Sequence, residues 1–298
     1  MSIRSQLWKN RQTLREMDMH YNQVWHVASA VTTTGTGKSW ESPFKTIAEA
    51  IAAASDGDII LMIGTFTEAL TSAKQLSFVN AGLTVNDCIW MESAAGDTLL
   101  TLTGKKCLFD GIRFRIPTTE GIGIDMTNSD YTVIKNCHFQ GRSGSYYGIY
   151  NSGGSQLKIL NNVFQYLNTA TYGAAILGHD YATVCPSGWI MKGNLFHSNL
   201  KHVQLVMRQS LIEGNTFQEK GLDADNVSSL TATHKLDLLT GSALGQLNTV
   251  TKNIMQGDYS ITGGYKPAVN DNWFGNISDD TAEAEVNADG TTLAVPAA

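Results

Sequence analysis

The 298-residue chain has few charged side chains, few prolines and no long apolar run. Lysine, arginine, aspartate and glutamate together make up 16% of it, whereas globular domains carry about a quarter. The apolar run at residues 59–63 is far shorter than a membrane span, and the first ten residues lack the apolar segment of a secretory signal. The net charge of −6 argues against binding to nucleic-acid phosphates, which needs an excess of basic residues on one face. We therefore expect no membrane association, no nucleic-acid partner and no secretion by a signal peptide.

Cysteine is also scarce, and its spacing excludes two kinds of site. The four cysteines form no Cys-x-x-Cys pair and have no histidine nearby at metal-ligand spacing; they are Cys88, Cys107, Cys137 and Cys185. We expect them to be buried thiols, with neither a disulfide framework nor a zinc site. The sequence predicts no metal and no cofactor.

What replaces the missing charge is a mixture of Gly, Thr, Ser and Asn, which favours turns and strands. The clearest helix is predicted over residues 42–55. Ser42 is suited to the N-cap position and Pro43 to the first helical position, and Gly57 ends the segment. The helix has one apolar face, formed by Ile47, Ala50, Ile51 and Ala54.

From about residue 105 the sequence repeats itself. Each copy is an apolar strand, then Asn or Gly, then an aromatic residue or Met. The last residues of the copies are 25, 25, 32, 21, 38 and 19 residues apart, and they are Phe114, Phe139, Phe164, Phe196, Phe217, Met255 and Phe274. A period in the twenties with one strand–turn–strand unit per copy predicts a solenoid, in which each copy must stack on its neighbours.

Two side-chain stacks are expected inside such a solenoid. Asparagine at the strand–turn boundary tolerates left-handed backbone angles, and its amide can bond to the equivalent amide of the next copy. The phenylalanine at the next inward position can stack along the axis.

The N-terminal part carries a more specific signal. Residues 37–51, with Gly57-Asp-Ile-Ile60 and Gly64-Thr-Phe-Thr-Glu68, resemble the opening of right-handed parallel β-helices of the pectate-lyase superfamily. The resemblance covers residues 25–276 and implies an all-β, single-stranded, right-handed parallel β-helix. On this view residues 42–55 are a capping helix, residues 1–24 an extended or helical arm, and residues 277–298 an irregular C-terminal tail. The fold hosts lyases, hydrolases and inert virion proteins, so it predicts no activity.

The catalytic motifs of pectate lyases and polygalacturonases are absent from the sequence. Tailspike-type hydrolases instead use two carboxylates without a fixed motif, about 5 to 9.5 Å apart. The candidate carboxylates are Asp180, Glu213, Asp223 and Asp225. Isolated surface acids are more often solvated turn residues than catalysts, so the simpler interpretation is no catalysis.

Three tyrosines stand close together among Gly and Ser, at Tyr146, Tyr147 and Tyr150. Tyrosine rings at such a place can stack on sugars. They can equally pack at a subunit interface, where tyrosine is enriched. The sequence leaves both interpretations open.

The N-terminal arm has a thin apolar stripe, formed by Ile3, Leu7, Leu14 and Met17, with Trp8 beside it. We expect this stripe to find its partner on another chain. The resemblance to phage spike and decoration proteins implies a structural virion component, made in the host cytoplasm and displayed as a homotrimer on the virion surface. Its arm would bind capsid or tail proteins, and its β-helix could adhere to host surface polysaccharide. The alternatives are a short tailspike depolymerase and a non-catalytic carbohydrate-binding module.

Overall fold

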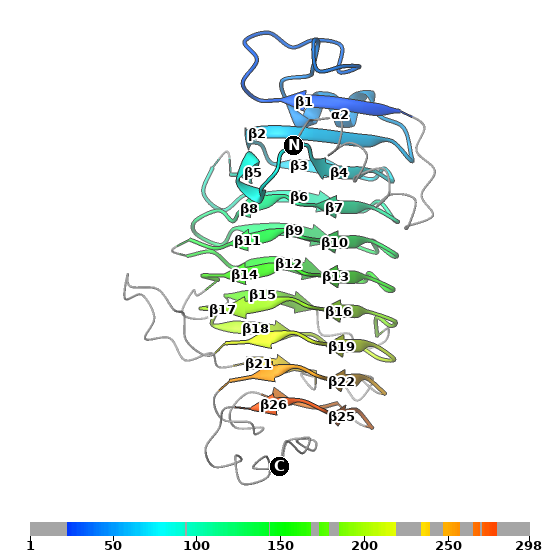
Figure 1. The fold of residues 1–298 in the computed structure, drawn as a ribbon, viewed down its shortest axis with the longest axis vertical. Helices are drawn as coiled ribbons and strands as arrows, with labels where there is room; N and C mark the ends of the chain where they lie inside the picture. Colours follow the sequence, from blue (N-terminus) through cyan, green and yellow to red (C-terminus); the bar gives the residue numbers. More distant parts are fainter. Residues whose placement is uncertain are drawn as a thin grey trace.

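The computed structural model describes residues 23–92, 94–142, 144–167, 173–178, 185–218, 234–238, 247–256, 265–268 and 270–278. In these residues the chain winds into a coil whose turns stack along one long axis (Figure 1). Each turn, or rung, contributes strands to three parallel sheets, which we call A, B and C in chain order. This is the parallel β-helix predicted from the sequence.

Sheet A runs the length of the coil. Its strands are β1 (Val24–Ala28), the first half of β2 (Ile59–Thr67), β4 (Ser77–Asn80), β7 (Leu108–Asp110), β10 (Val133–Lys135), β13 (Lys158–Leu160), β16 (Ile190–Lys192), β19 (Leu211–Glu213), β22 (Thr249–Thr251) and β25 (Asn272–Phe274).

Sheet B follows sheet A after a tight turn. Its strands are the second half of β2, β5 (Cys88–Met91), β8 (Arg113–Arg115), β11 (His138–Gln140), β14 (Val163–Gln165), β17 (Leu195–His197), β20 (Thr216–Phe217), β23 (Ile254–Met255) and β26 (Ile277–Ser278).

Sheet C completes each rung. Its strands are β3 (Leu70–Ser72), β6 (Thr98–Leu102), β9 (Ile122–Met126), β12 (Tyr147–Asn151), β15 (Ala174–Gly178), β18 (Lys201–Gln204), β21 (His234–Asp237) and β24 (Tyr265–Lys266). We number the rungs from rung 1 (β2 and β3) to rung 9 (β25 and β26), with β1 above rung 1. A short 3₁₀ helix, η1 (Val85–Asp87), lies before β5.

The capping helix is shorter than predicted. Helix α2 spans Ile47–Ala53, and its N-cap is Thr46 instead of Ser42. Thr46 and Glu49 form a reciprocal capping box, and the carboxylate of Glu68 accepts hydrogen bonds from the next two helix N–H groups. Residues 42–45 are not helical because Phe44 pairs with strand β1, its N–H donating to the carbonyl of His26. Among the described residues, no helix is long and apolar enough to cross a bilayer.

The predicted aromatic stack lies on the inner side of sheet B. In register from rung 1 to rung 8 it contains Phe66, Trp90, Phe114, Phe139, Phe164, Phe196, Phe217 and Met255. From Phe114 to Phe217 the ring centroids are 4.8 to 5.1 Å apart, with interplanar angles of 3 to 12°. The rings therefore stack at the spacing of the strands themselves. Each fully buried ring contributes about 2–3 kcal/mol of transfer free energy.

The last predicted copy is wrong. Phe274 lies in sheet A, points outward and is 43% exposed, while its neighbour Trp273 fills the core. Ser278 occupies the position below Met255 in sheet B. Asn272-Trp-Phe274 has the letters of the repeat, but the asparagine at the turn of this rung is Asn276. The β-helix therefore extends to Ser278, two residues into the predicted tail; residues 279–298 lie outside the described residues.

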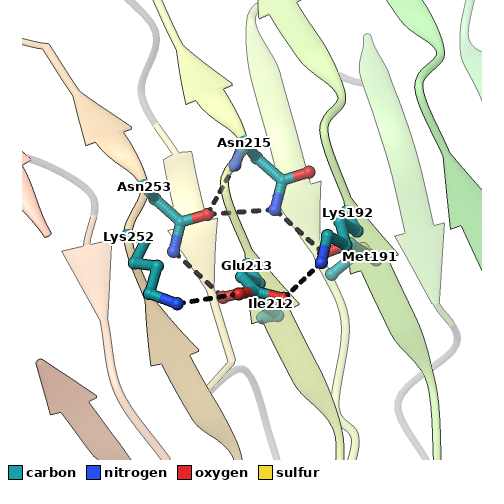
Figure 2. A network of polar contacts seen from close by, with 7 residues as sticks. All are labelled: Met191, Lys192, Ile212, Glu213, Asn215, Lys252 and Asn253. Atoms are coloured by element: carbon teal, nitrogen blue, oxygen red, sulfur yellow. Dashed lines mark hydrogen bonds and ion pairs between the residues drawn. The ribbon is translucent and has the colours of Figure 1, made fainter. Parts of the chain in front are cut away.

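The predicted amide stack is also present, at the turn between sheets A and B (Figure 2). Each Nδ2 donates to the Oδ1 of the next rung at 2.8 to 3.0 Å, through Asn162, Asn194, Asn215, Asn253 and Asn276. Each Nδ2 also donates to a backbone carbonyl of the preceding rung, such as that of Met191 for Asn215. All five side chains are buried, so these bonds satisfy groups that water cannot reach.

The left-handed backbone falls one residue before the stacked asparagine. This position, with its equivalents before Ile112 and Cys137 in the rungs above the stack, holds Gly111, Asn136, Asn161, Gly193, Gly214, Lys252 and Gly275, with φ between 54 and 74°. The stacked asparagines themselves are not in the left-handed region. The sequence predicted one asparagine with both a left-handed backbone and a stacked amide. In the structure two adjacent residues divide these roles: the first has the left-handed backbone of the turn, and the second forms the hydrogen bonds between rungs.

Replacing one stacked amide should destabilise the fold strongly. Asn215→Ala leaves the Met191 carbonyl and the Asn194 N–H without their partners inside the protein, so we expect a loss of about 3 kcal/mol in unfolding free energy. Asn272→Ala is the control, since Asn272 is exposed in sheet A, and it should cost under about 0.5 kcal/mol. Equal urea midpoints for the two variants would contradict this role.

A histidine is buried among the lower rings of the stack. The ring of His202 in β18 lies 6.1 Å from Phe196 and 6.2 Å from Phe217. Its Nε2 lies 2.8 Å from the Gln218 carbonyl and its Nδ1 lies 3.3 Å from the Asn199 amide nitrogen. A neutral ring with its proton on Nε2 satisfies both contacts. Burial lowers the pKa of His202 to about 3.

Acid should therefore destabilise the protein before its carboxylates titrate. Below pH 6.5 the unfolded state takes up a proton on residue 202 that the folded state refuses, so stability falls as the pH drops. For this group the loss is about 2 kcal/mol between pH 7 and pH 5. The His202→Gln variant should show a flatter pH dependence of its unfolding free energy; an unchanged slope would rule out His202 as the cause.

Candidate functional site

The outer face of sheet C gathers aromatic, acidic and basic side chains in two columns. The register aligns Asp125, Tyr150, Leu177, Gln204, Asp237 and Lys266 in one column. Beside it, Tyr147 of rung 4 aligns with Ala174 and Lys201 of rungs 5 and 6. Rungs 3 to 8 therefore present a mixed aromatic and polar strip along the coil.

The three predicted tyrosines meet at the upper end of this strip. The rings of Tyr147 and Tyr150 lie 5.5 Å apart at an interplanar angle of 22°, and both are half-buried. Tyr146 lies 5.7 Å from Tyr147, and its hydroxyl donates to the Glu120 carboxylate at 2.9 Å. The rings form a shelf of aromatic surface with hydroxyl groups at its edges. Such a surface offers both apolar and polar contacts to a ligand.

Close packing below the shelf fixes its position. Gly148 lies between the two tyrosines in β12, and a Cβ there would come within 2.7 Å of the Ala175 carbonyl oxygen. It would also lie 3.2 Å from Phe164, a member of the aromatic stack. Strand β12 can thus lie directly on the core only because this residue has no side chain. The shelf therefore rests on the most regular part of the molecule.

Asp125 lies one rung above Tyr150 in the same column. Partial burial raises the pKa of the Asp125 carboxyl above 3.8. Burial, and then the charge of Asp125, raises the pKa of Tyr150. One carboxylate oxygen of Asp125, Oδ1, is buried without a hydrogen-bond partner. No donor among the described residues satisfies this oxygen, which costs free energy while it stays buried.

In the lower half of the strip, lysine side chains interact with neighbouring acceptor side chains. Lys201 donates to the Gln204 amide oxygen at 3.0 Å, and burial lowers the pKa of Lys201. Lys266 lies 3.3 Å from the buried carboxylate of Asp237. Donors and acceptors therefore continue along the axis below the tyrosines.

The predicted catalytic acids do not form a pair in the described residues. Glu213 lies on the outer face of sheet A, where its carboxylate contacts Lys192 at 2.8 Å and Lys252 at 3.2 Å (Figure 2). Hydrogen bonds from these two lysines lower the pKa of Glu213, which holds it deprotonated. Its geometry is that of an ion pair across three rungs. Asp180, Asp223 and Asp225 lie outside the described residues.

The remaining sequence predictions concern the cysteines, metal binding and the N-terminal arm. The four cysteines are buried and form no disulfide, and burial raises the pKa of each thiol. No cluster of three metal-ligating side chains occurs in the part of the chain that the structure describes. The arm residues Ile3, Leu7, Trp8, Leu14 and Met17 lie outside that part.

The sequence predicted the tyrosines as candidate site residues, and the register of sheet C adds Asp125, Lys201 and Gln204 to the same face. A usable signal exists in the sheet C strands, which read Ile122-Gly-Ile-Asp-Met126, Tyr147-Gly-Ile-Tyr-Asn151 and Ala174-Ala-Ile-Leu-Gly178. Aligned on the central Ile, these strands place Asp125 and Tyr150 in one column. The repeat in sheets A and B obscured this second, weaker repeat.

Comparison with known proteins supports the fold. A model of the family described as "Right handed beta helix region" matches residues 69–233. Pectate lyase Pel9A superimposes with a TM-score of 0.61 and 17% identity, over 88% of this chain and 71% of the other. A rhamnogalacturonan lyase gives 0.56 and 11%, over 80% and 69%. The GH136 lacto-N-biosidase from Eubacterium ramulus gives 0.63 and 10%, over 92% and 58%.

No curated protein matches the chain. At these identities the structural matches concern the fold alone, and the fold is one shared by polysaccharide lyases and a glycoside hydrolase. The family model covers more than half of the sequence and includes strands of all three sheets. The chain is a member of the right-handed β-helix family.

Proposed function

We propose that this protein binds a glycan along the outer face of sheet C and does not cleave it. The observation that carries the proposal is the pair of near-parallel rings, Tyr147 and Tyr150, beside the unpartnered oxygen of Asp125. A pyranose has an apolar face that packs on an aromatic ring and hydroxyl groups at its rim that bond to polar groups. The shelf supplies both kinds of contact within one rung of each other.

The periodicity of the strip suits a chain of sugars. Rungs repeat at about 4.8 Å, which is comparable to the length of one pyranose unit. A glycan lying along the axis would meet the tyrosines of rung 4 and then Lys201 and Gln204 of rung 6. Between them, rung 5 presents only Ala174 and Leu177, so nothing bulky in the described residues separates the two groups.

Binding is favoured over cleavage by the separation of the acids in this column. Asp125 and Asp237 are four rungs apart, on the order of 19 Å, well beyond the 5 to 9.5 Å of a hydrolase pair. Asp237 is also held in an ion pair with Lys266. The depolymerase alternative therefore depends on Asp180, Asp223 and Asp225, which lie outside the described residues.

The setting predicted from the sequence remains part of the proposal. We infer from the resemblance to spike and decoration proteins that the glycan-binding β-helix is displayed as a homotrimer on a phage particle, joined to capsid or tail proteins. Mass spectrometry of purified particles and native mass spectrometry of the isolated protein test this setting. A monomer that is absent from particles would refute it without affecting glycan binding.

Removing the aromatic shelf should abolish most of the affinity. We expect Tyr147→Ala and Tyr150→Ala each to weaken binding of the best ligand on a glycan array at least about tenfold, equivalent to 1.4 kcal/mol. Asp125→Asn should weaken it by a similar factor, because a charged hydrogen-bond acceptor is lost. Titration calorimetry gives the affinities.

The matched control is Tyr131→Ala. Tyr131 is 54% exposed and lies in the turn between β9 and β10, outside the strands of sheet C. This variant should bind as the unaltered protein does. Equal affinity of all four variants would refute the site, and release of reducing ends or unsaturated sugars from the bound glycan would refute binding without cleavage.

A further inference from the structure

Two arginines lie side by side on the outer face of sheet B. Arg113 and Arg115 are the outward residues of β8 in rung 3, on either side of the buried Phe114. Their Cα atoms are about 6.6 Å apart, because the two residues are two positions apart on one strand. Both residues are partly exposed. The outer face of sheet B therefore presents two guanidinium groups within a single rung.

The guanidinium of Arg113 is held in place by uncharged acceptors. Its Nε and Nη2 both donate to the side-chain oxygen of Gln140 in rung 4, and its Nη1 donates to the side-chain oxygen of Asn86 in η1. A guanidinium has five N–H donors. These three bonds leave one N–H on each terminal nitrogen without an acceptor in the described residues. Two donors at the end of one guanidinium can bind two oxygens of a single anion.

No carboxylate forms an ion pair with either arginine in the part of the chain that the structure describes. Two acids lie close by, and both have other partners. The carboxylate of Asp87 in η1 accepts hydrogen bonds from the N–H groups of Leu83 and Thr84, at 2.8 Å each. Glu92, which directly follows β5, is paired with Arg142.

The neighbouring outward side chains do not supply a counter-charge. They are Ile89 and Met91 in rung 2, and His138 and Gln140 in rung 4. Burial, and then the charge of Arg113, lower the pKa of His138 to about 4, so its ring is neutral at pH 7. Burial, and then the charge of Arg115, lower the pKa of Arg113, whereas a neighbouring carboxylate would raise it. The two arginines thus carry unopposed positive charge in a protein whose net charge is −6.

The charge and the donors at this place suit a phosphate group. A phosphate monoester carries close to two negative charges at neutral pH and has three terminal oxygens, so it can bind both arginines at once. A carboxylate carries one charge and two oxygens, which the end of one guanidinium would occupy. Arginine suits this task better than lysine, because its planar fork fixes the direction of two bonds together.

We propose that Arg113 and Arg115 form a binding site for a phosphate group, with Asn86 and Gln140 as positioning residues that orient Arg113. The phosphate is inorganic phosphate or the phosphate of a phosphorylated sugar, and both offer the same oxygens to the arginines. The site lies on sheet B, so it is separate from the glycan-binding strip of sheet C.

Phosphorus-31 NMR titrations of the full chain with inorganic phosphate and with glucose 6-phosphate test the proposal. At low ionic strength we expect a Kd of about 1 mM or lower for at least one of them. Equal affinities assign the site to the phosphate group alone, and tighter binding of the ester assigns it to a sugar phosphate. Arg113→Gln and Arg115→Gln should each weaken binding at least about tenfold. Lys158→Gln removes an exposed positive charge from sheet A, and it should change the Kd less than about twofold.

Gln140→Glu tests the site without removing an arginine. A carboxylate at residue 140 would pair with Arg113 in place of the amide oxygen and offset its charge, so binding should weaken at least about tenfold. Thr216→Glu makes the same change of charge in the column of Arg113, four rungs lower and on the order of 19 Å away. This distance exceeds the Debye length, so the variant should bind phosphate as the unaltered protein does.

Absence of binding for both probes overturns the proposal, as does affinity that survives the changes at Arg113 and Gln140. An equal loss in the Lys158→Gln or Thr216→Glu variant also overturns it, since the attraction would then come from the overall charge. Acetate should displace the phosphate only at concentrations at least about tenfold higher. Displacement by an equal concentration of acetate would contradict the choice of phosphate over a carboxylate. Thermal unfolding of each variant checks that the β-helix is intact.

Discussion

The structure depends on the stacking of buried asparagine amides at the turn between sheets A and B. Backbone pairing alone would allow neighbouring strands of a parallel sheet to slip, because every residue offers the same N–H and C=O groups. Each stacked asparagine instead donates both to the amide of the next rung and to a carbonyl of the preceding one. A slip of one residue would leave several of these groups buried without partners, at about 1–3 kcal/mol each. The amides thus select one register.

Register in turn decides what the surface can do. In a β-helix, residues that are 21 to 38 positions apart in sequence become neighbours only if the rungs align, as the phenylalanine column of sheet B demonstrates. The same alignment sets Asp125 beside Tyr150 and places Glu213 between Lys192 and Lys252. The outer faces of sheets C and A consequently differ: sheet C is aromatic and polar, and sheet A changes from apolar to charged along its length.

These columns also explain how far the sequence could predict the molecule. The fold was predictable because the pattern combines a turn, a buried amide and a buried ring in four residues, as in Gly193-Asn-Leu-Phe196. The site was only partly predictable, since Tyr146, Tyr147 and Tyr150 are neighbours in sequence but Asp125 joins them only through the register. Phe274 shows the limit of the pattern: Asn272-Trp-Phe274 fits it in letters, yet it lies in sheet A because Asn276 makes the turn.

The asparagine stack does not extend through the whole coil. Above its upper end, other residues take the place of asparagine and sheet A has buried apolar residues on both sides. In rungs 2 to 4 its position is occupied by Cys88, Ile112 and Cys137, and the first amide is that of Asn162 in rung 5. The upper rungs therefore lack the bonds that fix register below. In these rungs sheet A also carries buried apolar residues on both sides: inward side chains such as Phe78 and Phe109, and the outward side chains Val79, Leu108 and Val133. A slip of one residue would exchange the inward and outward side chains of these strands and would reduce the apolar area that they bury. Two different forces thus hold the two halves: polar stacking in the lower rungs, and burial on both sides of sheet A in the upper ones.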